Sequence, residues 1–347
     1  MRHIFLLLAF SAVFFSCSHK AEHVERAFYY WKNNEYELTG GERQLLDALK
    51  IRKMYLKCFE VEYNDVMGGI PIAKSRMHEP YYYDDEKRHD SINVIPAVYI
   101  KNEVFLKSSR QELDTLAANV DFLAVKYIKI YKKGIKVKEL QIDCDWTLKS
   151  RDNYFYFLNK LKKISGKQIS CTLRLYPYKY PDKMGVPPVD KATLMCYNLI
   201  NPLASKNQNS ILDVDELSKY LNKRRKYKLH LDIALPVFSW AQLYQNNRFK
   251  AIIYPEDILN DKSFKRLKPF WYEVNKDTVI DDFYLREGDV VKFETIKDKN
   301  ISDAIAIIKK NIVFTDTTTI TLFHLDDKQL KKYSYETLSG FYSAFSE

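Results

Sequence analysis

Eight short runs of β-forming residues alternate with segments of helical periodicity, and this alternation constrains the fold more than any other feature. The runs are rich in apolar, β-branched and aromatic residues and span 27–31, 54–61, 93–99, 137–145, 168–175, 192–198, 228–236 and 319–325. Between them, apolar residues recur at helical spacing, as in Leu113, Leu116, Ala117 and Val120. Eight strand–helix units predict an α/β fold, a (β/α)8 TIM barrel over residues 27–347.

Two segments interrupt the alternation. Residues 63–92 form a long polar and aromatic stretch after the second strand, which predicts a loop at the functional face of a barrel. Residues 241–300 contain β-like pieces such as "FKAIIYP" and "DVVKFETI". Because eight strands already close a barrel, we expect this segment to form a small α+β insertion after strand seven, outside the barrel sheet.

The N-terminus has the pattern of an export signal. Arg2 precedes an apolar stretch that ends at Ser16 and Cys17, too short for a spanning helix. A small residue followed by cysteine is typical of a bacterial lipoprotein, which predicts a signal peptide over 1–16, lipidation of Cys17 and a tether over 17–26. An ordinary signal peptide with a chance cysteine is the alternative. We expect a lipid-anchored protein of the bacterial cell envelope, at the outer membrane.

The charge pattern argues against nucleic-acid binding. The chain has 55 Lys and Arg against 45 Asp and Glu, but the basic residues are scattered and accompany no nucleic-acid motif. The remaining cysteines lie inside strand-like runs without close pairing, so we expect buried free thiols. His230 and His324 have no partner at metal-ligand spacing, so we expect both to be core or rim histidines, and we expect no metal and no cofactor.

Two carboxylates mark the fourth strand, "LQIDCDWT". Gln141, Asp143 and Asp145 share one face of this strand, because side chains alternate along it. Buried carboxylates need partners, and Asp145 comes at the strand end, where barrel active sites lie. Both aspartates are therefore candidate site residues. Arg174, on the inward face of the next strand, is an alternative explanation, since an ion pair with either aspartate would make them structural.

Three strand ends together resemble one family. "QIDCDW" in strand four, "LMCYN" in strand six and "LDIALPVF" in strand seven are similar to motifs of glycoside hydrolase family 18, the chitinase and endo-N-acetylglucosaminidase barrels. The resemblance implies a TIM barrel with an insertion after strand seven. It also implies catalytic roles for Asp143 and Asp145, and contacts from Tyr197 and Asn198 to an N-acetylated sugar.

The family pattern is incomplete in this chain. Thr147 stands where the resemblance places the catalytic glutamate, and a hydroxyl has no proton to give near neutral pH. A replacement acid would have to come from another strand end. The candidates are Glu60, Glu62, Asp65 and Asp326, each of which also fits an ordinary rim carboxylate.

Aromatic residues near strand ends complete the predicted site. Stacking surfaces for a sugar, or alternatively packing residues, are Trp31, Trp146, Tyr197 and Trp240, with Glu60, Arg174 and Asn198 as polar contacts. We expect a protein that binds an N-acetylhexosamine-containing glycan with weak or no hydrolysis. The alternatives are a divergent hydrolase with a relocated acid and an envelope scaffold without sugar contact.

Overall fold

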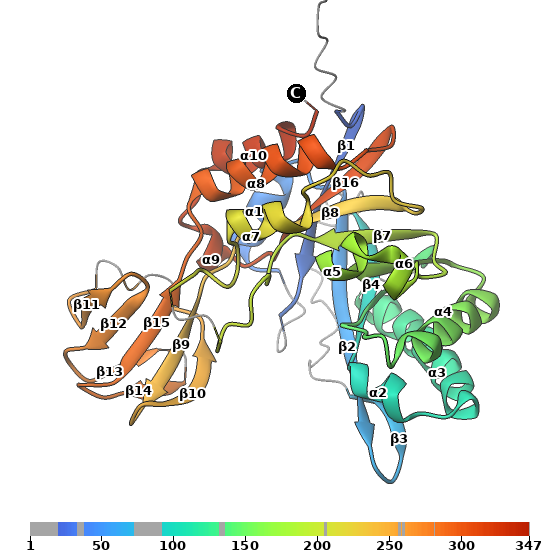
Figure 1. Ribbon diagram of the computed structural model, residues 1–347, viewed down its shortest axis with the longest axis horizontal. Coiled ribbons are helices and arrows are strands. Elements are labelled where there is room, and N and C mark those ends of the chain that lie inside the picture. Colours follow the sequence, from blue (N-terminus) through green and yellow to red (C-terminus); the bar gives the residue numbers. More distant parts are fainter. Residues whose placement is uncertain are drawn as a thin grey trace, which may run out of the picture.

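The computed structural model describes residues 20–32, 38–72, 92–131, 136–204, 207–255, 258, 261–280 and 282–346. Its main sheet contains eight parallel strands, one at each position that the sequence predicts (Figure 1). They are β1 (His23–Tyr30), β2 (Lys53–Asn64), β4 (Asn93–Ile100), β5 (Glu139–Asp143), β6 (Gln168–Leu173), β7 (Lys191–Met195), β8 (His230–Pro236) and β16 (Thr317–Phe323). All eight predicted runs are confirmed, with ends shifted by a few residues.

The eight strands close into a barrel. They follow the order β1-β16-β8-β7-β6-β5-β4-β2, and β1 pairs in turn with β2. The closing registers place His23 beside Thr317 and Ala27 beside Lys53. The start of the predicted loop over 63–92 is a hairpin instead, because β3 (Gly68–Ile72) pairs antiparallel with the end of β2. Residues 73–91 of that loop lie outside the described residues.

Helices cover the outside of the barrel (Figure 1). They are α1 (Gly40–Ala48), α2 (Asn102–Lys107), α3 (Arg110–Tyr131), α4 (Arg151–Ser165), α5 (Leu175–Lys179), α6 (Pro181–Met184), α7 (Val214–Tyr220), α8 (Asp298–Asn311), α9 (Asp327–Leu330) and α10 (Tyr335–Ser343). The longest, α3, buries the apolar stripe that contains Leu113, Ala117 and Val120. Helical periodicity in the sequence therefore marks the face that packs on the sheet.

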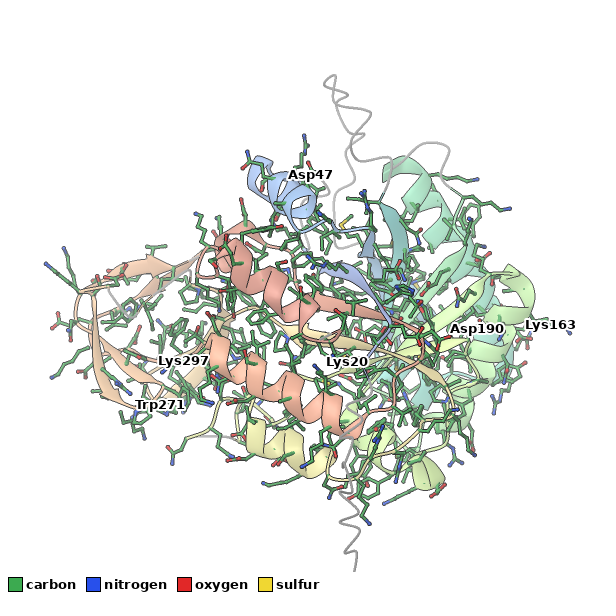
Figure 2. The ribbon with its side chains drawn as sticks, turned by 90° about the horizontal axis from the view of Figure 1, so that it is seen from above. Lys20, Asp47, Lys163, Asp190, Trp271 and Lys297 are labelled. Atoms are coloured by element: carbon green, nitrogen blue, oxygen red, sulfur yellow. The ribbon has the colours of Figure 1, made fainter. Side chains whose placement is uncertain are left out.

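The segment after β8 forms a separate unit at one end of the molecule. Its strands are β9 (Trp240–Gln245), β10 (Arg248–Ile253), β11 (Phe264–Lys268), β12 (Trp271–Val274), β13 (Thr278–Ile280), β14 (Phe283–Leu285) and β15 (Val290–Glu294). Five of them make one antiparallel sheet, β10-β9-β15-β12-β11, with its own apolar core. Figure 2 shows Trp271 of this insertion far from Lys163 of α4.

The insertion lies outside the barrel sheet, as predicted. Residues 289–296, "DVVKFETI", contribute β15, whose partners are β9 and β12. The helical part expected of an α+β insertion is not present among the described residues of 240–294, which form strands and turns only.

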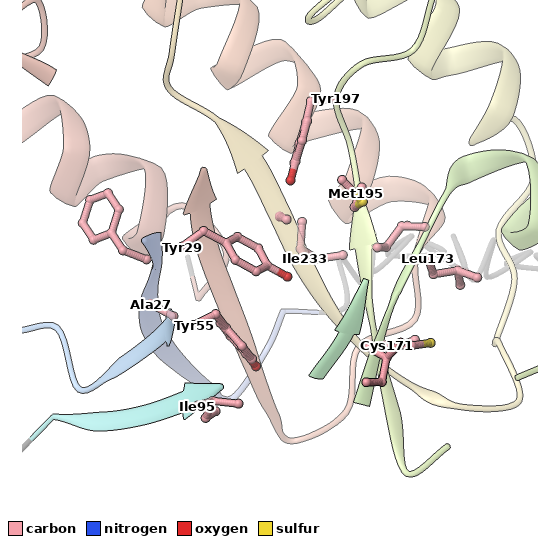
Figure 3. Close-up of a cluster of buried hydrophobic side chains, with 14 of the residues drawn as sticks. Ala27, Tyr29, Tyr55, Ile95, Cys171, Leu173, Met195, Tyr197 and Ile233 are labelled. Atoms are coloured by element: carbon pink, nitrogen blue, oxygen red, sulfur yellow. The ribbon is translucent and has the colours of Figure 1, made fainter. Parts of the chain in front are cut away.

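The barrel interior contains a layer of hydrogen-bonded polar side chains. The Tyr29 hydroxyl donates to Gln141 Oε1 at 2.8 Å, and Gln141 Nε2 donates to Thr193 Oγ1 at 3.2 Å. Figure 3 shows Tyr29 among buried side chains from several strands. Gln141 thus points inward, as the predicted alternation of strand four requires.

The four cysteines of the barrel are buried free thiols, as predicted: Cys58, Cys144, Cys171 and Cys196. Burial raises the pKa of each thiol. No helix in the described part of the chain is long and apolar enough to cross a membrane. Cys17 and the rest of the signal segment lie outside the described residues.

Candidate functional site

A cleft opens at the carboxyl ends of β1, β7, β8 and β16, the mouth where parallel barrels keep their sites. Its volume is about 560 Å³. The residues that line it are Trp31, Lys32, Lys57, Asn198, Phe238, Trp240, Tyr254, Phe323, His324, Asp326 and Gln329. Three predicted binding residues, Trp31, Asn198 and Trp240, therefore meet in one cleft.

Aromatic rings form a continuous wall of this cleft. The ring centroids of Trp31 and Phe323 are 5.9 Å apart, those of Phe323 and Phe238 are 5.6 Å apart, and those of Phe238 and Trp240 are 5.6 Å apart. Tyr197 lies below the wall, fully buried, with its ring 5.1 Å from that of Phe323. Tyr197 thus supports the wall from behind and is not among the lining residues.

Two polar atoms of the cleft residues are buried without a hydrogen-bond partner in the described part of the chain, Asn198 Oδ1 and His324 Nδ1. Asn198 has a φ of 52°, in the left-handed region, which asparagine tolerates better than most residues. Strained backbone and unpaired buried polar atoms both carry a free-energy cost, and they occur together most often at ligand sites.

His324 is an uncharged imidazole at neutral pH. Burial lowers its pKa to about 4, and nearby Lys32 contributes in the same direction while Asp326 opposes it. The expectation that His324 is a core or rim histidine was incomplete, because it lines the cleft. A neutral imidazole offers one donor and one acceptor, which suits the hydroxyl groups of an uncharged ligand.

The two aspartates of strand four do not line this cleft, although both were expected in its floor. Asp145 forms a bidentate ion pair with Arg174, at 2.5 Å to Nε and 2.9 Å to the terminal nitrogen. Asp143 accepts a hydrogen bond of 2.5 Å from Thr172 Oγ1. Arg174 is therefore the ion-pair partner of Asp145, which is the alternative interpretation given for it above.

Asp143 is the carboxyl group with the most altered acidity at the barrel mouth. Burial raises its pKa to about 6, and the charge of Asp145 raises it further, whereas the hydroxyl of Thr172 and the charge of Arg174 lower it. The group is half-protonated near pH 6 and mostly ionised at pH 7. It therefore has the acidity of a proton donor but not a position in the lining of the cleft.

The candidate replacement acids are held by their own partners. Lys57 pairs with Glu60, Lys101 pairs with Glu62 at 2.7 Å, and Lys107 pairs with Asp65 at 3.1 Å. Asp326 Oδ1 accepts from the backbone nitrogens of Lys328 and Gln329 at 3.0 and 3.3 Å and caps α9. Of these four candidates, Asp326 lies in the cleft lining, and Glu60 pairs with the lining residue Lys57.

Thr147 and Trp146 lie away from the cleft. Thr147 is exposed in the turn before α4, where Ser150 Oγ accepts from its backbone nitrogen at 2.9 Å. The Trp146 ring is 6% exposed and packs on Tyr154 and Phe155 of α4, with centroids 5.9 and 5.2 Å away. The expectation that Trp146 stacks on a sugar was therefore wrong, because the ring belongs to the core.

Several lining residues were not predicted as site residues, namely Lys32, Lys57, Phe238, Tyr254, Phe323 and Gln329. Phe238 stands two residues before Trp240, and its place at the end of strand seven was a usable signal. Tyr254 belongs to the insertion, and no local pattern connects it with the barrel mouth.

The described residues contain no cluster of three or more His, Cys, Asp or Glu side chains that could hold a metal ion. The side chains that line the cleft offer aromatic stacking, neutral hydrogen bonding and lysine–carboxylate pairs.

Comparison with solved structures finds a similar barrel in a spore cortex-lytic enzyme and in a chitinase domain. The spore cortex-lytic enzyme SleL from Bacillus megaterium matches with a TM-score of 0.51 and 13% identity over 92% of this chain and 74% of that one. Catalytic domain 2 of a Group II chitinase from Ostrinia furnacalis, a mutant in complex with penta-N-acetylchitooctaose, matches with a TM-score of 0.50 and 11% identity over 92% and 95%. The likeness shows that this chain shares the (β/α)8 barrel fold of these two proteins.

Sequence comparison adds no closer relative. No family model matches the chain. No curated protein matches it either. At these low identities the structural likeness establishes the barrel fold, while the chemistry has to be argued from the cleft.

Proposed function

We propose that this protein binds a glycan that contains N-acetylhexosamine, in the cleft at the carboxyl ends of β1, β7, β8 and β16, and that it hydrolyses the glycan slowly or not at all. The observation that carries the proposal is the lining of the cleft, in which the rings of Trp31, Phe323 and Trp240 accompany neutral polar groups. Sugars present apolar ring faces and many hydroxyl groups, and this combination of aromatic and neutral polar side chains is complementary to both.

The acetamido group of such a glycan has a partner in the cleft. Asn198 Oδ1 is a buried acceptor that lacks a donor among the described residues, and an acetamido N–H is a donor of the right kind. The fold supports the same ligand class, since the Ostrinia furnacalis domain of similar fold is in complex with a chitooligosaccharide.

Weak or absent hydrolysis follows from the carboxylates. Substrate-assisted cleavage needs a free acid beside the leaving oxygen and a carboxylate that orients the acetamido group. In this chain Thr147 replaces the acid, and Arg174 binds both oxygens of Asp145. Loss of a general acid costs about 10² to 10⁴ in rate, whereas binding groups persist without it.

A hydrolase with a relocated acid is the second candidate. Because the pKa of Asp143 is raised, Asp143 is the carboxyl group best suited to be that acid. This candidate requires Asp143 to reach the bound sugar. Rapid turnover of chitooligosaccharides by the unmodified protein, abolished in Asp143→Asn, would establish it in place of the binding function.

The proposed location is the bacterial outer membrane, with lipid on Cys17 and the barrel in water. The basic and apolar N-terminus that ends in Ser16 and Cys17 supports this location.

Calorimetric titration tests the binding function. Chitooligosaccharides and N-glycan fragments are titrated into the wild-type protein and into Trp240→Ala, with Trp271→Ala as the matched control in the same insertion. We expect binding to weaken at least about tenfold in Trp240→Ala, as for other truncated aromatic anchors, and to be unchanged in Trp271→Ala, which is not a cleft residue.

The same titration can reject the proposal. Absence of binding of both ligand classes at millimolar concentration would favour an envelope scaffold without sugar contact. Equal losses in the two tryptophan variants would place the ligand elsewhere on the molecule.

A further inference from the structure

A fully buried carboxylate in the insertion, Glu294 on β15, receives hydrogen bonds from several elements. Oε2 accepts from Trp240 Nε1 at 2.6 Å, from Ser210 Oγ at 2.7 Å and from Gln242 Nε2 at 3.4 Å. Oε1 accepts from the Ser210 backbone nitrogen at 2.8 Å and from Lys292 Nζ at 2.7 Å. Both Lys292 and Glu294 have side-chain exposures of 0%, so the pair lies wholly in the interior.

These contacts connect Glu294 with two walls of the cleft. Trp240, at the start of β9, is a lining residue and is held directly. Ser210 belongs to the segment after β7, where Leu199 donates to the Ser210 carbonyl at 3.2 Å and Asn198 donates to the Ile211 carbonyl at 2.7 Å. Asn198, the second lining residue, is therefore held through Ser210 and its neighbour.

We propose that Glu294 is a positioning residue for the cleft, which sets the orientation of the Trp240 indole and the place of the Asn198 segment. The inference rests on the proposed glycan-binding function and adds a role for the insertion. The insertion fixes two side chains that follow different barrel strands, β7 and β8, so that an aromatic face and an amide stay at a constant separation for one sugar unit.

The chemistry of the five donors explains why the residue is a carboxylate. Every partner of Glu294 is an N–H or O–H group, and a carboxylate offers acceptor sites on both oxygens. A glutamine has one acceptor oxygen and one NH₂ group. The NH₂ group, itself a donor, would face another donor on one side. Glu294→Gln therefore keeps the volume but releases either Trp240 or the Ser210 backbone.

The test is the indole region of a ¹H–¹⁵N spectrum together with glycan affinity. The chain has four tryptophans, and Trp240→Phe identifies the Trp240 signal. In Glu294→Gln we expect that signal to move and its proton to exchange faster with water, while the Trp271 signal stays in place. We expect chitooligosaccharide affinity to fall about tenfold, the loss of one well-placed contact.

A double variant separates positioning from stability. Lys292→Met combined with Glu294→Gln removes both buried charges. We expect this double variant to regain the melting temperature that Glu294→Gln alone loses, but not the glycan affinity. Glu273→Gln, in the neighbouring strand β12, is the matched control and should leave both quantities unchanged. The inference is overturned if the Trp240 signal does not move or if affinity returns with stability in the double variant.

Failure of the glycan-binding function is distinguishable from failure of this inference. If the wild-type protein binds no glycan, the proposed function fails, and the indole signal still reports whether Glu294 sets the position of Trp240.

Discussion

At the scale of single residues, burial decides the chemistry of the barrel mouth. Asp143 and Asp145 are two residues apart and end on the same side of β5, yet they differ in environment. Asp145 is 48% exposed and paired with Arg174. Asp143 is half-buried, and its burial raises its pKa to about 6. The charge of Asp145 is thus balanced by an ion pair, whereas burial makes Asp143 a weaker acid than a free aspartate.

Asp143→Asn is expected to stabilise the protein above pH 6. A raised pKa means that the folded state holds a proton between about pH 4 and pH 6, so the wild-type protein loses stability as pH rises through this window. The asparagine oxygen can still accept from Thr172. We expect a gain of roughly 1–2 kcal/mol at pH 8 that disappears near pH 4, measured by urea unfolding. A gain that is the same at both pH values would show that Asp143 does not titrate in this window.

At the scale of elements, the end of β5 and helix α4 together determine where the side chains of residues 146 and 147 lie. Ladder hydrogen bonds of β5 end at Asp143, so the residues that follow are placed by contacts with α4. Trp146 lies against Tyr154 and Phe155, and Ser150 closes the turn with Thr147. The end of the strand-four segment is thereby a strand–helix connection packed on α4.

Trp146→Ala is expected to destabilise the protein without weakening glycan binding. Removal of a buried tryptophan leaves a cavity between β5 and α4 and costs about 3 kcal/mol or more. Thermal unfolding and calorimetric titration of the same sample check the two parts. Weaker glycan binding with unchanged stability would mean that the ring contacts the ligand.

At the scale of the whole molecule, a charged layer closes the barrel below the site. Lys191 lies between Glu139 and Asp232, at 3.1 and 3.2 Å, and joins strands β5, β7 and β8. Asp232 also accepts from the Thr319 backbone nitrogen of β16 at 2.8 Å. Buried charges of this kind are tolerated because each has partners on several strands.

Asp232→Asn is expected to lower stability by about 3 kcal/mol at pH 7, because it leaves Lys191 with one fewer carboxylate in the interior. Burial opposes ionisation of Asp232, but His230, Lys191 and the Thr319 N–H more than compensate, and its pKa falls to about 2. The stabilisation is present above pH 4 and is lost as pH falls toward 2. Urea unfolding at pH 7 and pH 3 should show a smaller difference between variant and wild type at the lower pH.

Cys17→Ala is expected to release the protein from membranes. We propose that lipid on Cys17 anchors the protein, and since one acyl chain binds only marginally, we expect more than one. Membrane fractionation of cells that express the variant checks this expectation. Unchanged sedimentation with membranes would exclude lipidation as the anchor.

The sequence by itself determined the barrel. All eight strands and the insertion after the seventh follow from local patterns, because strand and helix periodicity are properties of consecutive residues. The inward direction of Gln141 and the burial of the four barrel cysteines follow from the same alternation.

Only the tertiary structure decided the site. Trp31, Asn198 and Trp240 come from distant parts of the chain and meet because the strands close into a ring, whereas Tyr254 joins them from the insertion. Trp146 is a core residue. It follows the last ladder pair of β5, so packing against α4, and not alternation along the strand, determines the direction of its side chain. The lining of a cleft depends on which strand ends lie next to each other. Closure of the barrel determines this arrangement, and no local segment of the sequence encodes it.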